Sequence, residues 1–210
     1  MRPDAFSLAG LYGPDIKRTD TYEAMVERVM AGVRAGRKVC FAVPGHPGVL
    51  ASPTHEAIRR ARAEGFEALM LPALSSIDHF YADAGVDPGS SGSMSLDATD
   101  FLVYGFAVNL SLGLILWQIG AIGNECGGRT VNRRGLELLA RTLLESYPVD
   151  HELIVYEAAR YAMADPVIMR LRLDELGSAP VPLASTLYVP PATRAEPLTA
   201  RLELLGIAGA

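Results

Sequence analysis

A strand, a glycine turn and a helix start follow one another in residues 39–54. The apolar run Val39 to Val43 ends at Pro44, the chain turns through Gly45-His46-Pro47-Gly48, and a helical pattern follows Ser52-Pro53. Glycines let the main chain approach a ligand without a Cβ clash, and prolines stiffen the turn. Such turns serve purely structural purposes in many proteins. In α/β enzymes, however, this arrangement brings the backbone close to a ligand, so we treat the turn as a candidate binding loop.

The first half of the chain alternates between helical and extended patterns. Asp20 followed by Glu23 is an N-cap signature, and Gly36 marks the end of the same helix. Alternating strands and helices predict a parallel sheet with right-handed crossovers. The expected elements are helix Thr21 to Ala35, strand Val39 to Val43, helix Thr54 to Glu64, strand Ala68 to Leu71 and helix Ser76 to Ala84. His55 is expected on the exposed face of its helix.

The second half predicts a mixed arrangement. Asn132 can cap a helix that runs to about Tyr147, and Trp117 is expected in the core. Residues 85–95 and 120–131 have loop composition, and a helix is expected within residues 192–210. The expected strands are Ala98 to Val103, Leu112 to Ile119, Leu153 to Tyr156, Ile168 to Leu173 and Ser185 to Val189. We therefore predict an α/β protein with a parallel domain at residues 1–119 and a mixed domain at residues 120–210.

Charge and composition exclude several classes of function. The chain has 210 residues and a net charge of −5, which argues against a nucleic-acid partner. Cys40 and Cys126 form neither a metal pattern nor a disulfide framework, and the four histidines lack metal-ligand spacing. The most apolar window, Leu110 to Ile122, is too short to cross a bilayer, and no signal peptide opens the chain. We therefore expect no metal, no membrane partner and a cytoplasmic location.

Several blocks occur in an order that resembles a known family. They are Leu11-Tyr12, Lys17-Arg18-Thr19-Asp20-Thr21-Tyr22, Gly45-His46-Pro47-Gly48-Val49, Leu71-Pro72-Ala73-Leu74-Ser75-Ser76, Ala98-Thr99-Asp100-Phe101-Leu102, Leu114-Ile115-Leu116-Trp117-Gln118-Ile119-Gly120, Tyr156-Glu157-Ala158-Ala159 and Ser185-Thr186-Leu187-Tyr188-Val189-Pro190-Pro191. The chain resembles the tetrapyrrole (corrin/porphyrin) methylase superfamily, the class III S-adenosylmethionine-dependent methyltransferases. Within it, the chain is most similar to the borosin peptide backbone α-N-methyltransferases.

The resemblance implies a two-domain α/β fold that binds S-adenosylmethionine between its domains, commonly as a homodimer. The cofactor-binding positions that it implies follow predicted strands, where α/β sheets place ligands. They are Gly45, His46, Val49, Ser75, Ser76, Gln118, Tyr156, Ala158, Ser185 and Thr186. Ordinary turn chemistry remains an alternative for each serine and glycine taken singly.

The resemblance also implies a catalytic role for Tyr12, Arg18 and Tyr22. A peptide nitrogen is a poor nucleophile because its lone pair is delocalised into the carbonyl, so methylation requires loss of the N–H proton. A guanidinium and phenol hydroxyls can stabilise the resulting imidate oxygen, and a phenol beside a cation becomes a usable base. The alternative is structural: Arg18 pairs with Asp15 or Asp20, and Tyr22 packs in the first helical turn.

The chain also departs from the family pattern. The strand, Gly-x-Gly loop and helix that usually come first are missing, so we expect an N-terminally truncated member with an unpaired sheet edge. Near the expected cleft, Pro44 replaces a tyrosine and Ala73 replaces a glycine. Further changes are Ala9 at an aromatic position, Ile77-Asp78-His79 for an acidic pair and cysteine, and Gly92-Ser93-Met94 for Gly-Cys-Gln.

Three functions remain open. The first is N-methylation of backbone amides on a separate precursor peptide, because no precursor segment follows Ala210. The second is methylation of a small, tetrapyrrole-like molecule on the same scaffold. The third is a catalytically impaired homologue that serves as a binding or dimerisation partner.

Overall fold

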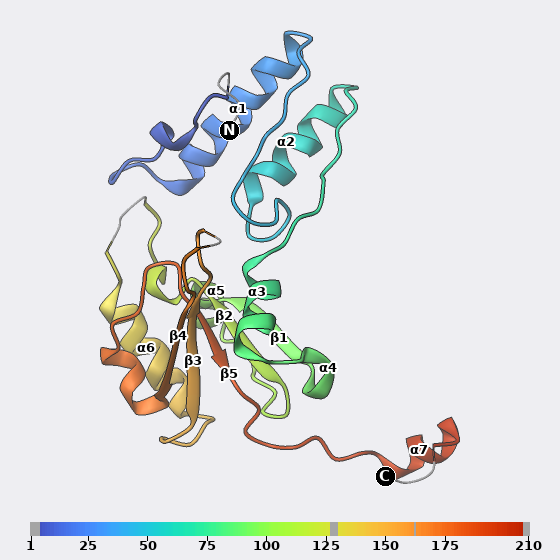
Figure 1. The fold of residues 1–210 in the computed structure, drawn as a ribbon, viewed down its shortest axis with the longest axis vertical. Helices are drawn as coiled ribbons and strands as arrows, with labels where there is room; N and C mark the ends of the chain where they lie inside the picture. The colour runs from blue at the N-terminus through green and yellow to red at the C-terminus, as the bar shows by residue number, and fades with distance from the viewer. Residues whose placement is uncertain (1–4, 127–129, 162, 208–210) are drawn as a thin grey trace. The chain divides into compact units, whose positions relative to one another are not determined.

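The computed structural model describes residues 5–126, 130–161 and 163–207 (Figure 1). Its contacts group the chain into two compact units. Unit 1 comprises Met1–Ala84 with Gly123–Thr130, and unit 2 comprises Gly85–Ile122 with Val131–Ala210. This grouping differs from the expected division at residues 119/120. The strand that precedes residue 119 belongs to unit 2, because it pairs with a strand from the C-terminal half of the chain.

Unit 1 is built on two helices that pack against each other, α1 (Arg18–Arg34) and α2 (Ser52–Ala63). One core cluster between them contains four buried side chains, Val26, Met30, Ala57 and Ala61, with Val29, Phe41 and Ala68 packed beside them. The unit also contains α3 (Ser76–Ala84), which begins and ends at the predicted residues, and the short η1 (Ala9–Leu11).

Ion pairs tie α1 to α2 along their solvent side. Arg60 contacts Glu23 at 2.6 Å and Glu27 at 2.8 Å, and Arg34 contacts Glu64 at 2.6 Å. Exposed ion pairs contribute about 0–1 kcal/mol each. They therefore fix how the two helices are aligned more than they stabilise the unit.

The start of α1 differs from the prediction. The helix begins at Arg18, its N-cap residue Lys17 makes no side-chain cap bond, and Asp20 lies inside the first turn. The Arg18 N–H donates to the Glu125 carbonyl at 2.8 Å. The first N–H groups of a helix have no partner within the helix, and a carbonyl from a distant segment satisfies this one. Asp20 still suits the positive end of the helix dipole.

The two predicted strands of unit 1 are wrong. Residues 39–43 and 68–71 lie in no strand, and among the described residues of unit 1 the only β pairing is the isolated bridge between Lys17 and Cys126. Leu69 and Leu71 are 70% and 72% exposed. An apolar, β-favouring segment becomes a strand only when a partner supplies a hydrogen-bond ladder. The sequence pattern describes the segment but not the partner.

Unit 2 contains a five-stranded sheet in the order β1-β2-β5-β3-β4 (Figure 1). The strands are β1 (Ser93–Asp97), β2 (Gly113–Trp117), β3 (Glu152–Glu157), β4 (Val167–Arg172) and β5 (Thr186–Val189). β1 and β2 are parallel, and the other pairs are antiparallel. The predicted strands in β2, β3, β4 and β5 are confirmed to within two residues at each end, and the sheet is mixed as expected.

Helix α6 (Arg133–Leu144) supplies much of the core that covers this sheet. Leu136, Leu139 and Leu143 recur at helical spacing and are almost completely buried. The Asn132 side chain accepts a bond from the Gly135 N–H, so the predicted cap is confirmed. The remaining elements are α4 (Pro88–Ser91), η2 (Ile119–Ala121), η3 (Leu173–Ser178) and α7 (Thr199–Leu205).

Residues 98–103 form a helix, α5 (Ala98–Tyr104), and not the predicted strand. The Asp97 carboxylate accepts bonds from the N–H groups of Thr99 and Asp100 and so caps this helix. The strand of this region, β1, ends at Asp97 and begins within a stretch predicted to be a loop. Asp97 followed by an apolar-periodic segment was the signal that the sequence reading missed.

Candidate functional site

The glycine turn of unit 1 has the conformation that its composition predicts. Gly45 lies at φ +74°, in the left-handed region that side chains with a Cβ rarely adopt. A Cβ on Gly48 would lie 2.8 Å from the Met70 sulfur, so a larger residue there would require the Met70 side chain to shift. Val49 follows on the surface and donates its N–H to the His46 carbonyl at 3.2 Å.

Side chains from the turn itself and from α2 hold this loop in place. The Gly48 N–H donates to His46 Nδ1 at 2.9 Å, so that ring nitrogen carries no proton. His55 Nε2 lies 3.0 Å from the Gly48 carbonyl, and the buried Thr54 hydroxyl donates to the Pro47 and Ala51 carbonyls. His55 is exposed as predicted. The sequence reading missed its contact with the loop, although the i, i+7 spacing from Gly48 could have indicated it.

The start of α3 lies beside the same turn. The Leu74 carbonyl is the nearest atom that a Cβ on Gly45 would meet, at 3.8 Å. The Ser75 N–H and hydroxyl both donate to one carboxylate oxygen of Asp78, at 2.6 and 2.8 Å. These two bonds, with a smaller contribution from His46, hold the pKa of Asp78 below its usual value. Ser75 is buried and Ser76 half-buried, so this predicted group is assembled in unit 1.

Tyr12, Arg18 and Tyr22 also lie together in unit 1. The rings of Tyr12 and Tyr22 meet edge to face with centroids 6.5 Å apart. Arg18 and Tyr22 are four residues apart on α1 and therefore share one helix face. The Thr21 hydroxyl donates to the Leu11 carbonyl at 3.2 Å, which fixes the segment before α1 against the helix.

The expected activation of Tyr12 as a base is not what the structure shows. Burial raises the pKa of Tyr12, the charge of Tyr22 and a hydrogen bond with it raise the pKa further, and Arg18 lowers it by less. Desolvation disfavours the phenolate more than the neighbouring cation favours it. Tyr12 is thus a neutral hydrogen-bond donor near pH 7.

A second group of predicted residues gathers at one edge of the unit 2 sheet. β2 and β3 both run antiparallel to β5, so their carboxyl ends and the start of β5 share this edge. Gln118 follows β2, Tyr156 lies at the end of β3, and Thr186 opens β5 directly opposite Tyr156. Ala158, half-buried, comes just after β3. Within unit 2, the strand ends thus bring Gln118, Tyr156 and Thr186 to one edge of the sheet.

The backbone around Gln118 and Ser185 is closely fitted. Gln118 adopts φ +58°, and the Ile119 N–H donates to the Ser185 carbonyl at 2.9 Å. A Cβ on Gly120 would lie 2.5 Å from the Pro182 carbonyl oxygen, so only glycine fits there. Left-handed conformations of non-glycine residues cost free energy and often occur at binding sites.

Ser185 carries the clearest sign of a ligand. Its side chain is fully buried, and its hydroxyl has no hydrogen-bond partner within the part of the chain that the structure describes. A buried hydroxyl left without a partner costs about 1–3 kcal/mol, so such groups call for an explanation. A ligand that accepts from or donates to this hydroxyl would remove the cost.

Among the described residues, no group of three or more His, Cys, Asp or Glu side chains could hold a metal ion. Within the same residues, no helix is long and apolar enough to cross a membrane.

Comparison with known families decides where the chain belongs. The family model for Tetrapyrrole (Corrin/Porphyrin) Methylases matches residues 2–177. The chain belongs to this family. Solved methylase structures have the same fold: a uroporphyrin-III-C-methyltransferase from Thermus thermophilus aligns with a TM-score of 0.55 at 21% identity, over 80% of this chain and 70% of that one. A cobalt-precorrin-4 methyltransferase aligns with a TM-score of 0.57 at 14% identity, again over 80% and 70%.

This methylase family member is also similar to curated fungal proteins. A methyltransferase and type I borosin cyclic peptide precursor of Coprinopsis marcescibilis is 36% identical over 96% of this chain and 54% of its own length. A methyltransferase and gymnopeptides precursor of Gymnopus fusipes is 37% identical over 90% of this chain and 47% of its own length. The chain thus spans about half the length of the curated relatives it matches.

The residues fit the cofactor that the methylase family implies. The unpartnered hydroxyl of Ser185 offers a hydrogen bond at a strand end. Gln118 is close to Ser185, because the N–H of the next residue, Ile119, donates to the Ser185 carbonyl. In unit 1, the turn at Gly45 has the left-handed conformation that glycine favours. Each group by itself offers hydrogen-bonding atoms of the kind that the polar parts of S-adenosylmethionine require.

Proposed function

We propose that this chain is an S-adenosylmethionine-dependent methyltransferase that N-methylates backbone amides of a separate precursor peptide. The buried, unpartnered Ser185 hydroxyl among aligned strand ends carries the cofactor part of the proposal. The grouping of Tyr12, Arg18 and Tyr22, together with relatives named as both methyltransferase and peptide precursor, supports the peptide part.

The cofactor-binding role falls to the residues predicted from the sequence. In unit 2, Ser185 and Thr186 donate hydroxyl hydrogen bonds, and Gln118, Tyr156 and Ala158 form the neighbouring strand ends. In unit 1, Thr54 and His55 hold the glycine turn. The main-chain groups of this turn, beside the start of α3, are available to bind the cofactor. The unit 1 contributors are Gly45, His46, Val49, Ser75 and Ser76.

The chemistry requires a proton removed and an oxygen stabilised. When bound, S-adenosylmethionine supplies a methyl group on a positively charged sulfur. That methyl group would pass to a deprotonated peptide nitrogen, and the electron pair of the broken carbon–sulfur bond would stay on sulfur. Arg18 and the neutral phenol of Tyr12 would donate hydrogen bonds to the imidate oxygen, and Tyr22 would take the amide proton as it passes its own hydroxyl proton to solvent.

Calorimetry with S-adenosylmethionine and its demethylated product tests the cofactor site. Saturable binding is expected, and Ser185→Ala should weaken it about 2- to 12-fold, the worth of one hydrogen bond. The same variant should unfold at a higher temperature without ligand, because it removes a buried hydroxyl that lacks a partner. Ser178→Ala, at an exposed position of η3, is the matched control and should alter neither value. Absence of saturable binding would refute both enzyme hypotheses.

Mass spectrometry of a peptide incubated in trans tests the reaction. Each methylation replaces a hydrogen with a methyl group. Arg18→Met should lower the rate about 100- to 1,000-fold, as loss of an oxyanion donor does in other enzymes. Arg28→Met, on the same helix, is the control. If Arg18→Met keeps full activity, or if tetrapyrrole-like molecules are methylated and peptides are not, the peptide proposal fails.

One observation favours a second candidate function. Residues 39–43 and 68–71 form no strand, and Leu69 and Leu71 are exposed. A homologue of this kind could serve as a binding or dimerisation partner for another methyltransferase instead of acting alone. Co-purification with an active relative, in the absence of cofactor binding by this chain, would favour that function.

A further inference from the structure

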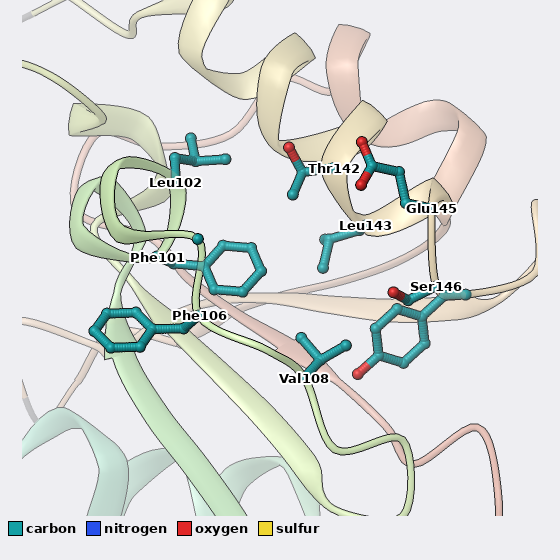
Figure 2. Close-up of a pocket in the computed structure, with 10 residues that line it drawn as sticks. Phe101, Leu102, Phe106, Val108, Thr142, Leu143, Glu145 and Ser146 are labelled. Carbon is teal, nitrogen blue, oxygen red and sulfur yellow. The ribbon is translucent and has the colours of Figure 1, made fainter.

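A cavity of about 170 Å³ opens in unit 2 between the end of α5 and the end of α6 (Figure 2). Phe101, Leu102, Phe106 and Val108 lie on one side, and Leu143 and Thr142 approach from α6 on the other. None of the residues predicted to bind the cofactor or the peptide lines this cavity.

Tyr147 lines the cavity and carries a buried polar group. Its side chain is only 4% exposed, and its hydroxyl has no hydrogen-bond partner among the residues that the structure describes. The ring is held from its other side by His151, with centroids 5.1 Å apart, and His151 Nε2 lies 2.9 Å from the Pro190 carbonyl. The phenol is therefore fixed in position while its hydroxyl remains unsatisfied.

The other polar groups that line the cavity either have hydrogen-bond partners within the protein or are exposed to solvent. The Thr142 hydroxyl donates to the Leu138 carbonyl at 2.9 Å. The N–H groups of Ser146 and Tyr147 both donate to the Leu143 carbonyl, at 3.0 and 2.9 Å. Glu145 is exposed at the mouth (Figure 2). Together with the negative end of the α6 dipole, it disfavours an anionic occupant.

We propose that this cavity binds a neutral, single-ring molecule that carries one hydroxyl or carbonyl group. Aromatic and aliphatic side chains on both walls suit a flat ring, and the single unsatisfied phenol suits a single polar group. The volume fits as well, since a cavity of about 150 Å³ lined by apolar side chains binds benzene in another protein. Burial also raises the pKa of Tyr147, so its hydroxyl stays protonated and can either donate or accept.

Phenol and benzene are the probes, and ligand-observed NMR titration of the whole chain is the measurement. Phenol should bind saturably. Tyr147→Phe should weaken phenol about 2- to 12-fold, the worth of one hydrogen bond, and should leave benzene binding unchanged or stronger. Circular dichroism verifies that the variant folds.

Val108→Phe fills the cavity and should abolish binding of both probes. Val103→Phe, at a 69% exposed position of α5 outside the cavity lining, is the matched control and should bind both normally. If native protein shows no saturable phenol binding, the Tyr147 hydroxyl is satisfied by water alone and the proposal is overturned. Equal phenol affinity in the native protein and Tyr147→Phe would overturn it too.

Discussion

The two units hold their candidate functional residues by different means. In unit 2, hydrogen-bonded strands fix the backbone, and a continuous core of leucine, valine and isoleucine backs the residues at the strand ends. In unit 1, a cluster of four buried side chains lies between α1 and α2, and the glycine turn is held by His46, Thr54 and His55. A sheet spreads the cost of one lost bond over many neighbours, whereas a loop held by single side chains depends on each of them.

Removing core volume from unit 2 should have the largest effect. Leu139→Ala deletes a fully buried side chain of α6 and should lower the free energy of unfolding by about 2 to 5 kcal/mol. Urea denaturation followed by circular dichroism measures this. Leu204→Ala, at an 88% exposed position, should change stability by less than about 0.5 kcal/mol. Similar losses in the two variants would contradict the assigned core.

The close approach at Gly120 should rank next. Gly120→Ala places a Cβ against the Pro182 and Leu183 backbone, which cannot move like a flexible side chain, and should cost about 1–3 kcal/mol. It should also displace Ser185 and weaken cofactor binding. Gly10→Ala meets nothing within 4 Å and serves as the control. Unchanged stability in Gly120→Ala would show that the loop adapts.

A single hydroxyl should matter in unit 1. Thr54→Val keeps the shape of the side chain but removes its bonds to the Pro47 and Ala51 carbonyls, at a cost of about 0.5–1.5 kcal/mol. Hydrogen exchange of the Gly48 and Val49 amides should accelerate, while exchange in β2 and β5 stays the same. Thr142→Val, which removes an exposed hydroxyl bond in unit 2, should not reproduce this pattern.

Acidification should lower the stability of unit 1 slightly, because the carboxylates whose pKa values are shifted are exposed to solvent. Four of its carboxylates, Glu23, Glu56, Glu64 and Asp78, have lowered pKa values, and that of Glu56 falls to about 2 through its bonds with Arg59 and Arg60. A lowered folded-state pKa contributes stability above the unfolded-state value, and this is lost as the pH falls through the folded-state value. The protection factors of amides in α1 and α2, which correct for the intrinsic pH dependence of exchange, should therefore fall between about pH 4.5 and pH 2. Glu56→Gln should flatten this dependence; an unchanged profile would contradict it.

Sequence patterns predicted elements whose signals are local. The Asn132 cap located the start of α6, the limits of α3 were correct, and the apolar runs of β2, β3 and β5 became buried strands. Three predicted elements were wrong because the contact that decides the structure lies in a distant segment or was not recognised in the sequence. The start of α1 is set by the Glu125 carbonyl, α5 by the Asp97 cap, and residues 39–43 lack a strand partner.

The candidate site was predictable in part for the same reason. Strand ends share one edge of a sheet, so the grouping of Gln118, Tyr156 and Thr186 followed from the pattern once the strands were right. The contacts of Thr54 and His55 with the glycine turn depend on how α2 folds back over it. The raised pKa of Tyr12 depends on burial, which the presence of Arg18 in the sequence did not reveal.

The sequence alone determined the family blocks, the glycine turn and the helices and strands with strong local signals, because caps, glycines and apolar periodicity act within a few residues. Only the tertiary structure decided which segments pair as strands, which hydroxyls are buried without a partner, and which phenol stays neutral. Strand pairing, burial and desolvation all depend on residues far apart in the chain. The unsatisfied hydroxyls of Ser185 and Tyr147, on which both binding proposals rest, belong to this second class.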